Sequence, residues 1–526
     1  MSYQSFGFIA FVAIALLIYY TIGKKRQLWV LALANLAFYV IAGIKYLPFI
    51  LITMVATFLT GKKIGSIYEK ADAEIAQCKE SQQKKEIRLA AKANAKRFLL
   101  TSLFISIGLL AVCKYLNFAV TNINHLLSLV NLSEISAFKI ILPLGISFYT
   151  FMAISYVLDI YWKRYKAEKN FLIYAVYLSY FPHVVQGPID RFNEFKPQIE
   201  SGVSLNFETL TFGAQLALWG FFKKLVIADT LGIFVDKVLS DWKNFDGIFI
   251  IFVFIVYSIQ IYTDFSGCID IVTGVSEMFG IKLRKNFNHP YFSKTMAEFW
   301  RRWHISLQEW FKDYIYYPVS ASSMMKKNKK KLKAKGWKRF EELYVSCFPI
   351  LVVWLITGIW HGASWKFVIW GIFHAILLIS SKVFEPTSIK ITHKLKLNTD
   401  NFLWKFYQMS RTFILCCVGR IFFRADNLNV AFSLIKKMLT RVSPACLLNR
   451  ELDYGLGLSD IALMCVAVLI LLVVDILQEK IKIRETLAKK NIAIRWIIVF
   501  AGLFAILLFG TYGPGYDAST FIYEQF

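Results

Sequence analysis

The stretch Met296–His374 places charged residues, histidines and tryptophans inside an otherwise lipid-like sequence. Residues 296–319 read MAEFWRRWHISLQEWFKDYIYYPV, and residues 354–375 read WLITGIWHGASWKFVIWGIFHA. The apolar run Tyr344–Trp360 is long enough to enter the hydrocarbon layer, and the glycine that follows His361 predicts a helix end there. Ionisable groups inside membrane segments usually have a function. This stretch therefore predicts a membrane helix and a functional centre together.

Two histidines of this stretch, His304 and His361, are candidates for one site. An imidazole near its ordinary pKa can take a proton from a hydroxyl group and return it to a leaving group, which is the chemistry of acyl or group transfer. The alternative is that each histidine is a hydrogen-bonded packing residue between apolar helices. On the residues alone, both interpretations stay open.

The composition is typical of a polytopic membrane protein. Of the 526 residues, 57% are hydrophobic and only 18% are charged, which lies far from a soluble domain. The formal net charge of +26 would suggest nucleic acid in a soluble protein. Here the basic residues cluster in short segments between apolar runs, as in cytoplasmic loops. We therefore expect anionic lipid headgroups and no nucleic acid among the partners.

Several common kinds of chemistry have no motif in this sequence. The eight cysteines show no CxxC spacing, so neither a disulfide framework nor a zinc site is indicated. The chain also lacks HExxH, GxSxG, GxGxxG and the phosphate loop GxxxxGK[ST]. We expect no metal and no resident cofactor.

Acidic side chains also occur within apolar sequence. Asp270 and Glu277 are seven positions apart and share a helix face, so they could act as acid and base, whereas Asp264 does not join them. Neutralisation of nearby arginines is the preferred interpretation, and we assign all three carboxylates support rather than catalysis; those arginines are Arg284, Arg301 and Arg302. Asp190 and Arg191 are adjacent and predict an internal ion pair, with binding of an acidic headgroup as the alternative.

Several blocks of the chain resemble the membrane-bound O-acyltransferase (MBOAT) family, and in particular its bacterial branch of alginate O-acetylation and teichoic acid D-alanylation proteins. FWRRWHISLQEWFKDYIYYPV and GIWHGASWKFVIWGIFHA are similar to the two signature blocks of that branch. Three further blocks follow its order: PLGISFYTFMAISYVLDIY at 143–161, FPHVVQGPIDRF at 181–192 and IYTDFSGCIDIVTGVSEMFGI at 261–281. The resemblance extends over most of the chain.

The resemblance implies roles for individual residues. His361 matches the near-invariant histidine of the family and would be the general base. His304 matches a second polar position and would polarise the thioester carbonyl or orient the donor. Arg301 and Arg302 precede His304 and could bind the phosphates of acetyl-CoA, although arginines beside tryptophans at a membrane boundary often only anchor a helix.

Charge places the segments relative to the membrane. The first basic cluster follows the apolar run Phe6–Ile22, which is the reverse of a cleavable signal peptide and predicts an extracytoplasmic N-terminus. The basic segments 62–97 and 326–339 are predicted as cytoplasmic loops, the first with helices lying at the membrane face. Residues 171–185 are predicted as a re-entrant element, and the number of crossings in 171–279 stays open.

We therefore predict an all-α polytopic protein in which residues 1–526 form a single domain. About eleven transmembrane helices, with re-entrant and interfacial helices, would surround a central funnel that holds both histidines. The expected location is a bacterial cell (inner) membrane.

The resemblance implies a membrane O-acyltransferase that moves an acetyl group from acetyl-CoA across the membrane. The acceptor would be an extracytoplasmic polysaccharide, reached directly or through a partner transferase. One alternative is D-alanyl transfer from an acyl carrier protein to teichoic acid. The alternative outside the enzymes is a proton-coupled transporter, although the sequence shows no inverted repeat.

Overall fold

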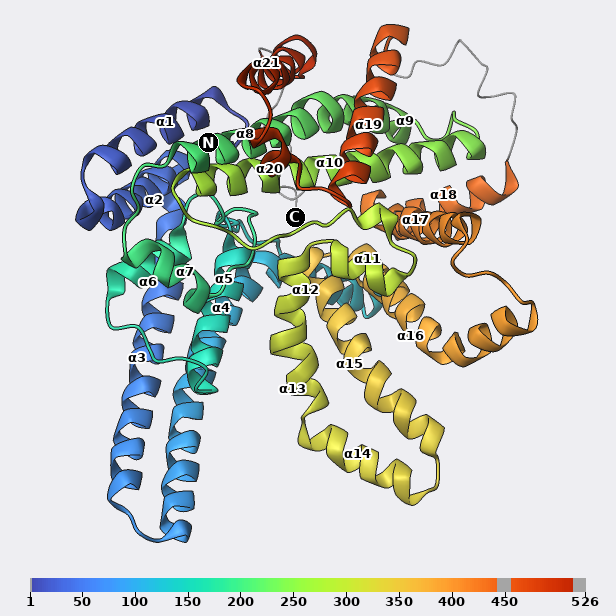
Figure 1. Ribbon diagram of the computed structural model, residues 1–526. Coiled ribbons are helices and arrows are strands. Elements are labelled where there is room, and N and C mark those ends of the chain that lie inside the picture. Colours follow the sequence, from blue (N-terminus) through green and yellow to red (C-terminus); the bar gives the residue numbers. More distant parts are fainter. Residues whose placement is uncertain (1, 442–455, 514–526) are drawn as a thin grey trace. The chain divides into compact units, whose positions relative to one another are not determined.

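The computed structural model describes residues 2–441 and 456–513, and most of them are helical (Figure 1). Within these ranges there is no β-strand, and the β-type pairing is a single antiparallel bridge between Phe287 and Trp303. The structure confirms the all-α prediction. It divides into two compact units that share helices α8 (Phe207–Phe221) and α10 (Gly247–Met278). The prediction of a single domain is not tested by this division.

Unit 1 consists of residues 1–214 and 272–284. Besides the first part of α8 and the end of α10, it contains seven helices: α1 (Phe6–Thr21), α2 (Gln27–Gly43), α3 (Leu47–Gln77), α4 (Ser81–Leu129), α5 (Ile146–Tyr161), α6 (Phe171–Ser179) and α7 (Phe192–Glu200). Helix α6 has nine residues, which is too short to cross a bilayer, as predicted for residues 171–185.

Unit 2 consists of residues 215–271 and 285–526. Its first helices after α8 are the π-helical turn η3 (Phe222–Ala228), α9 (Asp229–Ser240), α11 (Met296–Arg302), α12 (Ile305–Phe311), α13 (Tyr317–Ser320) and α14 (Ser323–Ala334). The later helices are α15 (Lys338–His361), α16 (Trp365–Lys394), α17 (Phe402–Arg424), α18 (Leu428–Thr440), α19 (Leu458–Gln478), α20 (Ile483–Ala488) and α21 (Ile492–Phe509).

Long apolar helices support a multi-pass membrane protein. Seven helical runs of the described residues are long and apolar enough to cross a membrane, and the first of them is Lys24–Gln77. The shorter helices α1 and α5 are also apolar. In α21 only 6% of the most apolar window is buried, so this surface suits contact with lipid chains. The count of about eleven spans stays a prediction.

The basic segment 62–97 is almost entirely helical, because α3 continues to Gln77 and α4 begins at Ser81. Its predicted place on the cytoplasmic membrane face stays a prediction. These two long helices lie side by side as a hairpin (Figure 1). The segment is rich in Ala, Lys and Glu, which favour helix, and it contains no proline. The basic segment 326–339 is likewise mostly helical, in α14.

Candidate functional site

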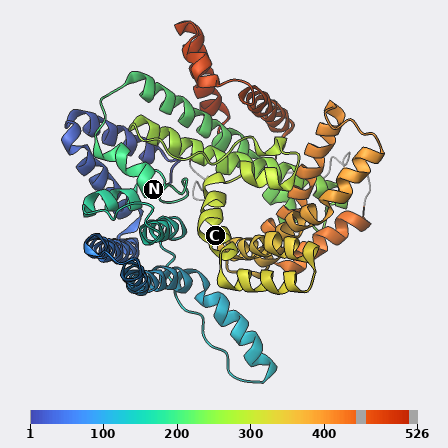
Figure 2. The same ribbon diagram turned by 60° about the horizontal axis from the view of Figure 1, so that its bottom comes forward.

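The hairpin of α15 and α16 sets the position of His361. Helix α15 ends at His361, as the following glycine predicted, and α16 begins three residues after Gly362. The two helices cross closely where Gly358 faces Gly371: a Cβ added to Gly358 would lie 2.5 Å from the carbonyl oxygen of Phe367 and 3.3 Å from the Cα of Gly371. Glycines permit this approach of two backbones. Helices α15, α16 and α17 remain together in the view turned by 60° (Figure 2).

His304 lies between α11 and α12, and backbone contacts with the segment around Phe287 set its position. The backbone N–H of Ile305 donates to the carbonyl of Asn286 at 2.9 Å, next to the bridge between Phe287 and Trp303. His304 adopts a left-handed backbone conformation with φ of 48° and is 1% exposed. Residues other than glycine rarely adopt this conformation, and those that do are found disproportionately at functional sites.

The amide of Asn286 determines which nitrogen of His304 carries the proton. The Oδ1 atom of Asn286 accepts the backbone N–H and the hydroxyl of Ser306, at 3.1 and 2.7 Å. Because a backbone N–H must meet an oxygen, the amide orientation follows from this contact. His304 Nδ1 lies 3.4 Å from the same Oδ1, so it must carry the hydrogen to donate there. The Nε2 atom then presents a lone pair, that is, a hydrogen-bond acceptor.

Burial keeps His304 neutral. Its imidazole is removed from water, and this desolvation lowers its pKa from 6.5 to about 3. The ring lies edge to face against Phe265, with ring centroids 4.8 Å apart. His304 is therefore uncharged at neutral pH and a weak base.

One cavity in unit 2 brings the two predicted histidines together. It is small, with a volume of about 40 Å³. Its lining is mostly aromatic, with a few polar groups: Ile261, Phe299, Trp300, Trp303, His304, Leu307, Gln308, His361, Trp370, His374, Cys416, Arg420 and Phe423. An apolar pocket with a small number of polar groups is typical of a substrate site. Whether this cavity belongs to the predicted central funnel stays a prediction.

The structure adds two residues that sequence analysis did not assign to the site, His374 on α16 and Arg420 on α17. His374 is 3% exposed, and its Nδ1 has no hydrogen-bond partner within the described ranges. A signal existed for both residues, because each is an ionisable side chain within an apolar helix. Sequence spacing alone could not show that they face His361.

The arginines before His304 have different surroundings. Arg302 pairs with Glu298 at 3.1 Å and with Glu479 at 2.6 Å, which suits a structural anchor. Arg301 is exposed at the protein surface and does not line the cavity. Binding of donor phosphates by these two arginines stays a prediction.

Two carboxylates of α10 contact lysines of η3. Lys223 contacts Asp270 at 2.7 Å, and Lys224 contacts Asp264 at 2.5 Å and Asp229 at 2.7 Å. The two lysines are consecutive in the π-helical turn. These contacts agree with a supporting role, because each of these charges faces an opposite one.

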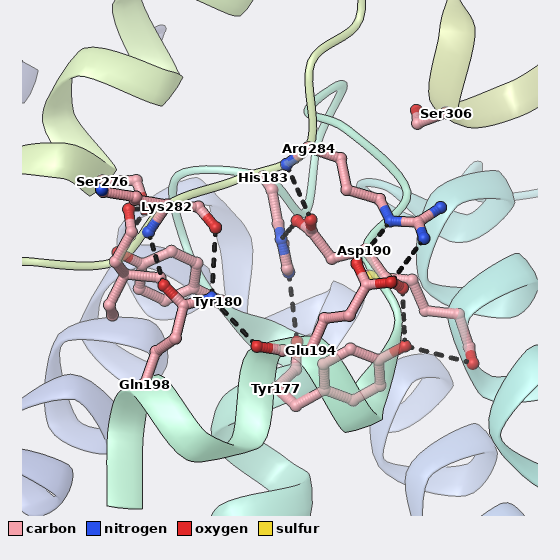
Figure 3. Close-up of polar contacts among 12 residues, drawn as sticks. Tyr177, Tyr180, His183, Asp190, Glu194, Gln198, Ser276, Lys282, Arg284 and Ser306 are labelled. Atoms are coloured by element: carbon pink, nitrogen blue, oxygen red, sulfur yellow. Dashed lines mark hydrogen bonds and ion pairs between the residues drawn. The ribbon is translucent and has the colours of Figure 1, made fainter. Parts of the chain in front are cut away.

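A second buried polar cluster lies in unit 1 (Figure 3). His183 is fully buried, with Nδ1 3.0 Å from the Asp190 carboxylate and Nε2 3.1 Å from the Tyr177 carbonyl. The other carboxylate oxygen of Asp190 accepts the backbone N–H of Arg284 at 3.0 Å. Asp190 therefore contacts His183, and its predicted ion pair with Arg191 stays a prediction. These contacts join the segment 180–191 to the segment that follows α10.

Metal binding was not expected for this chain. Within residues 2–441 and 456–513, no group of three or more His, Cys, Asp or Glu side chains could hold a metal ion. That the site uses neither a metal nor a resident cofactor stays a prediction.

Comparisons with known proteins identify relatives of this chain. Residues 166–333 match the model of the MBOAT, membrane-bound O-acyltransferase family; His304 lies inside this match and His361 after it. A peptidoglycan O-acetyltransferase of Helicobacter pylori is 31% identical over 453 residues, which cover 81% of this chain and 76% of that protein.

Two further relatives differ in how much of the chain they cover. A protein of Pseudomonas syringae pv. tomato described as a probable alginate O-acetylase is 29% identical over 423 residues, covering 80% of this chain and 71% of its own. A teichoic acid D-alanyltransferase of Bacillus subtilis is 28% identical over 258 residues, covering 47% of this chain and 60% of its own.

Proposed function

The chain belongs to the membrane-bound O-acyltransferase family and is a multi-pass membrane O-acyltransferase, and from this premise we propose that it transfers acetyl groups from acetyl-CoA for O-acetylation of an extracytoplasmic polysaccharide. The observation that carries this proposal is the cavity that both His304 and His361 line. The relatives named as O-acetylating enzymes cover about four fifths of the chain, against about half for the D-alanyltransferase. This difference favours acetyl over D-alanyl transfer.

In this proposal His361 is the general base. It takes the proton of the acceptor hydroxyl while the hydroxyl oxygen attacks the thioester carbonyl carbon. The carbon–oxygen bond forms, the tetrahedral intermediate collapses with cleavage of the carbon–sulfur bond, and the imidazolium returns the proton to the leaving thiolate of CoA. The enzyme ends in its starting protonation state.

His304 orients the donor. Because its Nε2 carries a lone pair, the neutral ring can accept a hydrogen bond from an N–H group of acetyl-CoA, whereas it cannot donate one to a carbonyl oxygen. The single proton of the acceptor hydroxyl is left for His361. The hydrogen bond to Asn286 therefore supports the orienting role over polarisation of the thioester. A low pKa suits this role, since the ring keeps its lone pair at neutral pH.

The experiment uses the full chain in lipid nanodiscs with acetyl-CoA labelled in the acetyl group. Alginate oligosaccharides and soluble peptidoglycan fragments serve as acceptors, chosen from the substrates that the relatives' names state. Labelled O-acetyl ester on a glycan, with an equal amount of free CoA thiol, supports the proposal. Transfer from a D-alanyl carrier protein but not from acetyl-CoA would replace it with the D-alanyl alternative. Histidine-dependent proton movement in proteoliposomes without ester formation would indicate a transporter.

A further inference from the structure

Arg420 is a buried cation in the wall of the histidine cavity. It lies one turn before the end of α17 and is 6% exposed. Its guanidinium carbon is 5.3 Å from the ring centroid of Tyr291 and 5.4 Å from that of Trp303. These two faces fix the plane of the guanidinium and supply part of the stabilisation that water would otherwise give.

The described residues supply no carboxylate to Arg420. None forms an ion pair with it, and its buried Nη1 has no hydrogen-bond partner there. The nearby Tyr291, Cys416 and Cys417 side chains are uncharged groups at neutral pH. Arg424, one turn later on the same helix, does pair with a carboxylate, Asp236, at 2.5 Å. A buried charge without a counter-ion is costly, so a site that keeps one usually receives an anion.

The proposed reaction generates an anion in this cavity. When the hydroxyl attacks the thioester, the carbonyl oxygen becomes an oxyanion, which needs hydrogen-bond donors in a site poor in water. His304 presents an acceptor, and the remaining lining is mainly aromatic. We propose that Arg420 is the oxyanion-stabilising residue, donating from its guanidinium to the carbonyl oxygen as charge develops there. This inference rests on the proposed function and names a catalytic residue for it.

Three substitutions of Arg420, to Met, Gln and Ala, distinguish this role from a structural one. Arg420→Met removes the charge but keeps a long apolar side chain, and replacing a buried charge in this way often leaves stability unchanged or raised. Arg420→Gln keeps a shorter hydrogen-bond donor. Arg424→Gln is the matched control, because it removes an arginine of the same helix that does not line the cavity.

The full chain in nanodiscs is assayed for acetyl transfer, with kcat, KM for acetyl-CoA and the thermal unfolding midpoint measured for each variant. For Arg420→Met we expect kcat to fall roughly a hundred- to a thousandfold, with KM within about twofold and the midpoint unchanged or higher. Arg420→Gln should lose less kcat, and millimolar methylguanidinium should restore part of the activity of Arg420→Ala. Arg424→Gln should keep the wild-type kcat.

Other outcomes overturn the inference. A wild-type kcat in Arg420→Met excludes an oxyanion role, and a raised KM with unchanged kcat indicates ground-state binding of an anionic substrate group instead. A lowered midpoint in both the Met and Gln variants, without methylguanidinium rescue of the Ala variant, indicates a structural arginine. Absence of acetyl transfer by the wild type itself would overturn the proposed function, and this inference with it.

Discussion

The imidazole of His361 lies edge to face with the indole of Trp370, with ring centroids 4.7 Å apart and ring planes at 80°. The same indole contacts His374 at a centroid distance of 4.7 Å. One tryptophan of α16 therefore holds the last residue of α15 and a histidine of its own helix in fixed positions. Such contacts orient a base without using its ring nitrogens for packing.

His361→Ala should abolish acetyl transfer while leaving folding intact. The substitution removes general-base catalysis, which contributes roughly a hundred- to ten-thousandfold, and the aromatic wall around the ring remains. Initial rates of labelled ester formation and the thermal midpoint check this expectation. His125→Ala, at an exposed position of α4, is the control and should behave as wild type. Near-wild-type activity of His361→Ala would remove this residue from the base role.

Asn286→Ala should lower kcat because Asn286 positions His304, although Asn286 itself does not contact the substrate. It removes the oxygen that selects the protonated nitrogen of His304, so the acceptor nitrogen is no longer fixed. Asn286→Asp keeps an acceptor but adds a negative charge, which favours the imidazolium and should raise the pKa of His304. As the pH is lowered, the Asn286→Asp variant should therefore lose activity at a higher pH than wild type does. A profile identical to wild type would contradict the positioning role.

The stability of the protein should fall as the pH falls from about 6.5 towards 3, in part because of His304. Burial lowers the pKa of this residue from 6.5 to about 3, so in this range the unfolded chain binds a proton that the folded protein does not. Protons then favour the unfolded state. Thermal midpoints in detergent at pH 7.5, 5.5 and 4.5 measure the effect. His304→Gln should show a smaller fall than wild type, and parallel falls would contradict the lowered pKa.

The N-terminus should be extracytoplasmic and the basic helix α14 cytoplasmic, according to the distribution of positive charge. Single cysteines at Ser2 and at the exposed Lys330, each in a chain whose native cysteines are replaced, test this topology. A membrane-impermeant maleimide should label the first in intact cells and the second only after permeabilisation. Labelling of position 330 in intact cells would reverse the predicted orientation.

Arg301→Gln and Arg302→Gln should separate donor binding from anchoring. Loss of Arg302 breaks ion pairs with Glu298 and Glu479, so its thermal midpoint should fall. Arg301 is exposed, and if it binds a phosphate of acetyl-CoA, Arg301→Gln should raise KM roughly tenfold at an unchanged midpoint, because a charge-assisted hydrogen bond is lost. An unchanged KM in both variants would remove these arginines from the donor site.

Local features of this protein were predictable from its sequence. The helix end at His361, the helices α19 and α21, and the break before α5 follow from apolar length and from glycine or proline at the boundary. Helix hydrogen bonds join residues four positions apart, so neighbouring residues determine where helices begin and end. The resemblance of the signature blocks likewise indicated the family without any knowledge of packing.

Only the tertiary structure decided which side chains meet. Asp264 and Asp270 contact lysines of η3, and Asp190 contacts His183. The sequence had suggested arginines as the partners of these carboxylates. Arg420 reaches the cavity from a helix more than fifty residues beyond His361. The physical reason is that such contacts depend on the crossing of helices and on which face each one turns inward, and an apolar helix buried on several sides carries no periodic signal of its inner face.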